Sequence, residues 1–148
     1  MPRILSLDDD PGILALLKAI FDICGYQALQ TTDEDEALSI LRTQGIDLFT
    51  QDFMRPGLGG VKFLQLLKLE AFFRDIPVLA ISAGDKDLRT RQLKQFGLDI
   101  DRDLAGYLKK PFTGADLLDT VESVLEKQGK PAPPETASCT EIRTRWKT

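Results

Sequence analysis

The stretch Ile4-Leu5-Ser6-Leu7-Asp8-Asp9-Asp10-Pro11 is a short apolar run that ends abruptly in three acids and a proline. The apolar run predicts a buried strand, and the proline suits the first turn of a helix. Apolar residues then recur at helical spacing from Ile13 to Cys24, ahead of Gly25, which is typical of a helix C-terminal end. The stretch therefore predicts one β-α unit with acidic side chains at the carboxyl end of its strand.

The same unit recurs four more times along the chain. Strands are predicted at residues 26–31, 46–51, 76–82 and 106–109, and helices at 33–44, 61–73, 86–96 and 113–127. The strand at 76–82 is almost continuously apolar, as expected for a parallel sheet covered on both faces. Five successive β-α units predict an α/β fold, a doubly wound parallel sheet with helices on both faces.

Length and composition favour one domain. The chain has 148 residues, of which 43% are hydrophobic, enough to build a core. We predict one domain over residues 1–128, followed by a flexible, proline-rich tail at 129–148. Trp146 is expected to be an exposed chain end, with a small docking anchor as the alternative.

Several classes of protein are disfavoured. No apolar stretch approaches the roughly 18 residues of a membrane helix, so we expect a cytoplasmic protein without membrane contacts. The net charge is −4, and the chain contains no histidine. Direct nucleic-acid binding is therefore not expected, nor is catalysis or zinc binding through histidine. Two cysteines, Cys24 and Cys139, are too few for a disulfide framework, and Cys24 is predicted to be a buried apolar residue.

Chemically active side chains follow four of the predicted strands. Asp8 and Asp9 come after the first strand, Asp52 after the third, Ser82 ends the fourth and Lys110 follows the fifth. Ligands of open parallel α/β sheets bind at the carboxyl ends of the strands, so these side chains should converge. Clustered carboxylates are costly unless protons, a lysine or a cation neutralise them; a hard divalent cation is the simplest solution, and oxygen ligands favour Mg²⁺ over zinc.

Four segments together resemble the signature segments of response-regulator receiver domains, over about residues 3–127. They are residues 4–11, quoted above, Asp47-Leu48-Phe49-Thr50-Gln51-Asp52-Phe53-Met54-Arg55-Pro56-Gly57, Pro77-Val78-Leu79-Ala80-Ile81-Ser82-Ala83 and Tyr107-Leu108-Lys109-Lys110-Pro111-Phe112. The resemblance implies a flavodoxin-like (βα)5 sheet with strand order 2-1-3-4-5. It also implies a two-component signalling switch that is not an enzyme.

The resemblance implies a role for each matching residue. Asp52 is the expected phosphoacceptor, attacking a phosphohistidine on a sensor histidine kinase or histidine phosphotransfer protein. Asp9 and Asp52 are the expected Mg²⁺ ligands, with Asp8 acting through water and Met54 through its backbone carbonyl.

The remaining matches concern the phosphoryl group and the switch. Lys110 is expected to bind the phosphoryl group, and the bond to Pro111 to be cis. Ser82 is the expected switch hydroxyl, Ala83 lies beside it in the phosphate-binding segment, and Tyr107 is the aromatic that moves inward. The downstream partner is expected to be a protein that the sequence does not identify.

Alternatives stay open for these residues and for the chain. Taken alone, Asp8, Asp9 and Asp10 could cap the following helix, Asp52 could be an ordinary turn residue, and Ser82 could satisfy a backbone group of its loop. Lys110 could be exposed, and Tyr107 could be core packing. A receiver-like module that binds partners without phosphorylation is the second hypothesis. A phosphatase of the haloacid-dehalogenase type is a weaker one, because Met54 stands where its second acid is needed.

Two departures from the family pattern are evident. Gly59-Gly60 stands where many receivers have an acid followed by glycine, and residues 96–104 make the stretch from Ser82 to Lys110 unusually long.

A solvated helix face is expected for the basic residues Lys86, Arg89, Arg91 and Lys94. With no predicted output domain after Gln128, we expect a regulator that acts through protein contacts.

Overall fold

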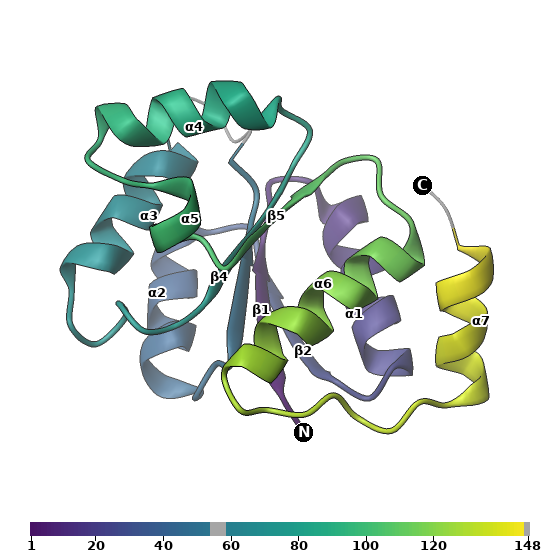
Figure 1. Ribbon diagram of the computed structural model, residues 1–148. Coiled ribbons are helices and arrows are strands. Elements are labelled where there is room, and N and C mark those ends of the chain that lie inside the picture. Colours follow the sequence, from purple (N-terminus) through teal and green to yellow (C-terminus); the bar gives the residue numbers. More distant parts are fainter. Residues whose placement is uncertain (54–58, 147–148) are drawn as a thin grey trace.

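The computed structural model describes residues 1–53 and 59–146 and contains a five-stranded parallel sheet (Figure 1). The strands are β1 (Arg3–Leu7), β2 (Gln27–Thr31), β3 (Leu48–Gln51), β4 (Val78–Ser82) and β5 (Gly106–Lys109). Their order is β2-β1-β3-β4-β5, and every pairing is parallel. The predicted fold class and strand order are thus confirmed.

Helices cover both faces of the sheet (Figure 1). The face with α1 and α6 also carries α7, whereas α2, α3, α4 and the short α5 lie on the opposite face. The bounds are α1 Pro11–Ile23, α2 Glu34–Thr43, α3 Gly59–Leu69, α4 Lys86–Gln95, α5 Ile100–Asp103, α6 Gly114–Lys127 and α7 Ala137–Arg145. Among the described residues, no helix is long and apolar enough to span a membrane.

Two apolar clusters, one on each face, hold the layers together. The first joins α1 and α6 to the sheet and includes Phe21 and Leu117, and the second joins α2, α3 and α4 to it and includes Phe49 and Leu93. Each square ångström of apolar surface that these clusters remove from water stabilises the fold by about 25 cal/mol. The sheet that these clusters cover presents the carboxyl ends of its strands, where the predicted site residues lie, at one edge.

The C-terminal segment, predicted to be a flexible tail, contains a helix. Residues 137–145 form α7, which Thr136 caps by accepting a hydrogen bond from the Cys139 amide at 3.1 Å. Cys139 forms a disulfide with Cys24, and the Trp146 ring packs against Phe112. The expectation of an exposed Trp146 was wrong. A nine-residue helix with few apolar residues has a weak sequence signal, and contacts with the folded body stabilise it.

The long connection before β5 is also folded. Asp99 caps α5 by accepting hydrogen bonds from the amides of Asp101 and Arg102, and Asp103 accepts one from the Asp99 amide at 2.8 Å. Leu98 and Leu104 on either side are buried in the second apolar cluster. The extra residues therefore form a capped turn that packs against the face with α4.

Candidate functional site

Two predicted acids lie side by side at the centre of the sheet edge. Asp8 follows β1, and Asp52 follows β3. The backbone N–H of Asp52 donates to the carbonyl of Leu7 at 3.2 Å, which continues the strand pairing one residue past β3. Both acids are buried, with exposed fractions of 3% for Asp8 and 7% for Asp52. Parallel pairing of β1 and β3 thus brings together two carboxylates that are far apart in the sequence.

Lys110 reaches both carboxylates from the end of β5. Its Nζ lies 3.0 Å from Oδ2 of Asp8 and 3.5 Å from Oδ2 of Asp52. The Lys110 amide donates to the carbonyl of Ser82 at 2.9 Å, and the Lys110–Pro111 peptide bond is cis. One ammonium between two buried carboxylates leaves an excess of negative charge in a region with little water, a setting that favours binding of a further positive charge.

The three successive acids after β1 have different environments. Asp10 caps α1 by accepting a hydrogen bond from the Gly12 amide at 2.8 Å, and its own amide donates to Asp8 Oδ1 at 2.9 Å. Asp9 is exposed. Helix capping, the alternative for all three, therefore describes Asp10 but not Asp8.

The predicted metal ligands converge only in part. Asp8 and Asp52 meet at Lys110, whereas the predicted ligand Met54 lies outside the described residues. Within residues 1–53 and 59–146, no group of three potential ligands is arranged to hold a metal ion. The carboxylate oxygens are nevertheless the donors that a hard cation prefers.

Ser82 and Tyr107, the predicted switch residues, both hydrogen-bond to one glycine of the loop after β4. Ser82 is fully buried, and its Oγ accepts a hydrogen bond from the Gly84 amide at 3.3 Å. The Tyr107 hydroxyl donates to the Gly84 carbonyl at 2.9 Å, and Ala83 between them is exposed. A displacement of Ser82 would therefore shift Gly84 and change the hydrogen bond that Tyr107 donates to it.

Comparisons with known proteins agree with this geometry. The sequence profile of the response regulator receiver domain matches residues 4–122. The chain belongs to the response regulator receiver family. Receivers are domains of two-component signalling proteins, and the phosphate regulon transcriptional regulatory protein PhoB of Klebsiella pneumoniae is 33% identical over 126 residues, 84% of this chain and 52% of that protein. A probable transcriptional regulator, ycf29 of Cyanophora paradoxa, is 34% identical over 86% of this chain and 58% of its own length.

Solved receiver structures share the fold. The receiver domain of the Francisella response regulator 1452 superimposes with a TM-score of 0.71 and 28% identity, over 86% of this chain and 99% of that one. The chemotaxis protein CheY4 of Vibrio cholerae has a TM-score of 0.72 at 24% identity, over 84% of this chain and 99% of its own. The present chain spans about half the length of the curated relatives quoted above.

The burial of one side chain near the predicted switch residues, that of Arg89, was not predicted. Arg89 of α4 is 6% exposed, and a Cβ added to Gly84 would lie 2.6 Å from its Nη2. The prediction that Arg89 lies on a solvated basic face of the helix was therefore wrong. The available signal was its position four residues before Leu93, which puts both on the same face of α4. Arg89 joins α4 to the loop that Ser82 and Tyr107 hold.

Proposed function

We propose that Asp52 accepts a phosphoryl group from a phosphohistidine on a sensor histidine kinase or a histidine phosphotransfer protein. A carboxylate oxygen of Asp52 attacks phosphorus, the phosphorus–nitrogen bond breaks, and the histidine leaves with the bonding electron pair. The product is an acyl phosphate. The observation that carries the proposal is the partly buried Lys110 ammonium, which contacts Asp8 and Asp52 together at the sheet edge.

Lys110 would bind the incoming phosphoryl group. Its Nζ is 3.5 Å from Asp52 Oδ2, so an oxygen of a phosphoryl group on Asp52 lies within reach of the same ammonium. A fixed positive charge at this place stabilises the charge that spreads over the phosphoryl oxygens during transfer. Asp8 keeps Lys110 near the sheet edge through a 3.0 Å ion pair.

Magnesium would bind on the acidic side of the same site. Asp8, Asp9 and Asp52 provide carboxylate oxygens, and the Met54 carbonyl is proposed as a further ligand on the basis of the family resemblance. The donor chemistry fits a hard cation. When bound, the ion would screen the negative charge between the acids and the phosphoryl group.

Ser82 would transmit the phosphoryl signal. A phosphoryl oxygen on Asp52 is a strong acceptor for the Ser82 hydroxyl and for the backbone N–H of Ala83. Movement of Ser82 toward it would weaken the 3.3 Å hydrogen bond from the Gly84 amide. Because the Tyr107 hydroxyl donates to the Gly84 carbonyl, Tyr107 would then be held less firmly. The shifted surface, which includes α4, would then bind a downstream protein. The domain would act as a switch and not as an enzyme that turns over a substrate.

Intact-mass spectrometry tests this proposal directly. The protein is incubated with a small acyl-phosphate donor and Mg²⁺, and a single phosphoryl addition is expected. The addition should disappear in Asp52→Asn and in the absence of Mg²⁺. Asp47→Asn is the matched control, because Asp47 lies at the other end of β3 and pairs with Lys130. It should be phosphorylated like the parent protein.

A phosphohistidine donor separates the two hypotheses for this receiver. If small donors fail while circular dichroism shows an intact fold, the protein is offered a phosphorylated histidine phosphotransfer protein. Transfer to Asp52 supports the proposal. No transfer from either donor would contradict it and favour the phosphorylation-independent interaction module.

A further inference from the structure

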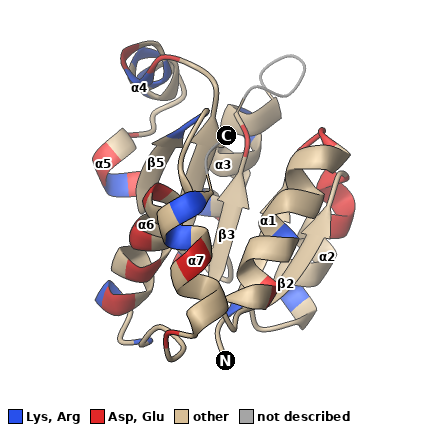
Figure 2. Cartoon of the chain, turned by 90° about the vertical axis from the view of Figure 1, so that its right-hand side faces the viewer, with Lys and Arg blue, Asp and Glu red and all other residues tan. Residues whose placement is uncertain are grey.

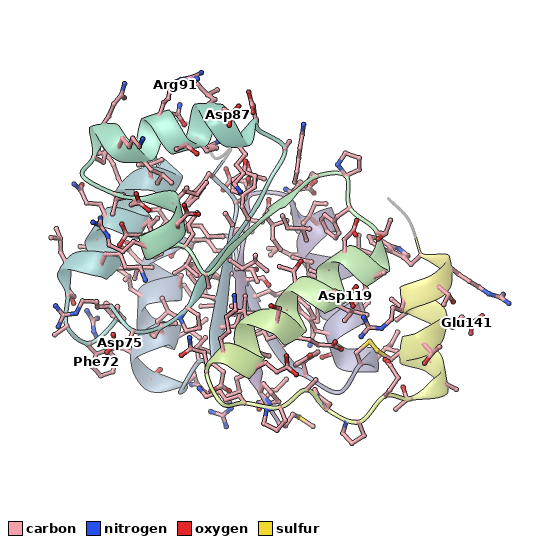
Figure 3. The ribbon with its side chains drawn as sticks, in the orientation of Figure 1. Phe72, Asp75, Asp87, Arg91, Asp119 and Glu141 are labelled. Atoms are coloured by element: carbon pink, nitrogen blue, oxygen red, sulfur yellow. A yellow bond between two sulfur atoms is a disulfide. The ribbon has the colours of Figure 1, made fainter. Side chains whose placement is uncertain are left out.

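The C-terminal helix is covalently attached to the body of the receiver. The disulfide between Cys24, just after α1, and Cys139, in α7, joins residues 115 positions apart (Figure 3). Both cysteines are 4% exposed. Figure 2 shows α7 lying across α1 and α6, on the outer side of that helical layer. The disulfide therefore determines how firmly a second layer is held on one face of the protein.

The end of α7 contacts the loop that follows Lys110. The Gly114 amide donates to the carbonyl of Trp146 at 3.0 Å, and the Trp146 ring lies 5.8 Å from the ring of Phe112. A Cβ added to Gly114 would be 2.5 Å from the carbonyl oxygen of Ile142. The helix therefore fits closely against residues 112–114, which begin two positions after Lys110.

The non-covalent contacts of α7 are limited. The helix has nine residues, and isolated helices shorter than about 12–15 residues are marginal in water. Besides Cys139, its apolar contacts come from Ile142 and Trp146. Arg143, 22% exposed, pairs with Asp119 and Glu122 of α6, whose side chains are 68% and 34% exposed, and ion pairs that remain in contact with water contribute modestly. Docking of α7 therefore depends strongly on the disulfide.

A surface groove lies beside this disulfide. Ile23 of α1 and Ser138, Glu141, Ile142, Arg145 and Trp146 line a groove of about 410 Å³ along the border of the two helices. Ser138 is the neighbour of Cys139. Fraying of the short helix at this groove would expose the sulfur atoms, and accessible disulfides are the ones that exchange with thiols.

We propose that the Cys24–Cys139 disulfide is a redox latch that sets the reactivity of the phosphoacceptor site. When it is oxidised, α7 holds residues 112–114 and thereby keeps Lys110 placed between Asp8 and Asp52. A dithiol reductant gives two electrons to the disulfide, which yields two cysteine thiols and the oxidised, cyclic reductant. The freed α7 then releases the loop, and Lys110 is positioned less accurately. Trp146 is thus a positioning residue, and this effect on reactivity rests on the proposed phosphorylation of Asp52.

The first experiment measures the latch without using phosphorylation. Hydrogen exchange is followed by mass spectrometry on the whole chain, before and after treatment with dithiothreitol, and alkylation counts the free thiols. Reduction should give two alkylated cysteines and loss of protection at residues 137–146 and 112–116. Protection elsewhere in the sheet should remain. Unchanged protection of α7 after complete reduction would overturn the latch.

The second experiment measures its effect on Asp52. The rate of phosphoryl addition from a small acyl phosphate is compared in the oxidised and reduced protein. We expect a fall of about threefold to tenfold on reduction, as for a modest misplacement of a catalytic group. The double variant Cys24→Ser/Cys139→Ser should have the reduced rate with or without dithiothreitol. Equal rates in both states would overturn the coupling.

Two further variants separate positioning from folding. In the oxidised protein, Trp146→Ala should lower the rate and Trp146→Phe should restore most of it, because phenylalanine keeps a ring against Phe112. Gly114→Ala should separate the end of α7 from residues 112–114 even with the disulfide intact, because its Cβ meets the backbone of Ile142. If neither redox state is phosphorylated, the proposed function fails, while the hydrogen-exchange result still decides the latch.

Discussion

The two faces of the sheet are covered to different depths. On one face, α1 and α6 lie under α7, and α6 buries six of its residues, including Leu117 and Val121. On the other face, α4 is a polar helix that buries only Arg89 and Leu93. A helix with few buried side chains opens at a lower free-energy cost than one with many. By this measure α4 is the more easily displaced helix, whereas α6, which buries six residues, is the firmer support on the other face.

The contacts of Ser82 and Tyr107, the predicted switch residues, also lead to α4. Ser82 and Tyr107 both hold Gly84, and Gly84 packs against Arg89 of α4. On the opposite face, the loop after Lys110 is held by Trp146. A phosphoryl group on Asp52 would thus lie between a firm support and a movable helix. The following predictions test this difference.

Matched leucine truncations should give the largest effect. Leu117 of α6 and Leu93 of α4 are both fully buried. Leu117→Ala should lower the free energy of unfolding by about 4 kcal/mol, because the doubly covered face cannot collapse into the cavity, and Leu93→Ala by about 2 kcal/mol, because α4 can shift inward. Urea denaturation measures both. Equal losses would mean that the two faces are equally rigid.

Two helix glycines, one on each face, test close packing near Asp52. A Cβ on Gly60 of α3 would lie 2.7 Å from the Cα of Phe53, so the backbone beside Asp52 must shift. We expect Gly60→Ala to cost about 2 kcal/mol and to slow phosphorylation. Gly12 of α1 is the control, since its added Cβ would meet the Asp10 side chain at 3.1 Å. Gly12→Ala should change stability by less than about 1 kcal/mol. A neutral Gly60→Ala in urea denaturation would contradict the close-packing argument.

The sequence was informative where a residue's place follows from strand position. Asp8, Asp52, Ser82 and Lys110 each stand at the carboxyl end of a strand, and parallel pairing brings such ends together whatever the sequence separation. The five β-α units were likewise evident from apolar periodicity, because each helix buries a wide apolar stripe.

The tail and Arg89 could not be predicted in the same way. No local pattern indicates that Cys24 would meet Cys139, since their contact depends on where α7 docks. The apolar residues of α7 are too few for a periodic signal. Arg89 has a side chain that is usually exposed, and its burial depends on Gly84, which leaves room for the guanidinium. These features arise from tertiary contacts and not from local propensity.

Asp103 gives a pH test of the face with α4. Burial acts to raise its pKa, but hydrogen bonds from the Arg102 side chain and the Asp99 amide outweigh this and hold the pKa below its ordinary value. A lowered pKa in the folded state stabilises the protein above the unfolded-state pKa of about 3.9, and this stabilisation is lost as the pH falls through the lower, folded-state value.

Replacement of Asp103 should therefore matter only at higher pH. Asp103→Asn should cost about 1 kcal/mol in urea denaturation at pH 7, and the difference from the parent protein should shrink below about pH 4. The exposed neighbour Asp101 is the control, and Asp101→Asn should have little effect at either pH. A loss that is constant from pH 7 to pH 3 would show that Asp103 acts through packing instead of charge.

Two threonine caps on the same face provide the smallest effect. Thr113 caps α6 in a reciprocal capping box with Asp116, and Thr136 caps α7 through the Cys139 amide. An N-cap threonine contributes about 1 kcal/mol. Thr113→Ala should lower global stability by that amount, because α6 unfolds with the sheet. Thr136→Ala should leave global unfolding nearly unchanged and should accelerate hydrogen exchange only within α7, because this helix can undock alone. An equal global loss for both variants would mean that α7 unfolds together with the core, and the doubly covered face would then be a single cooperative unit.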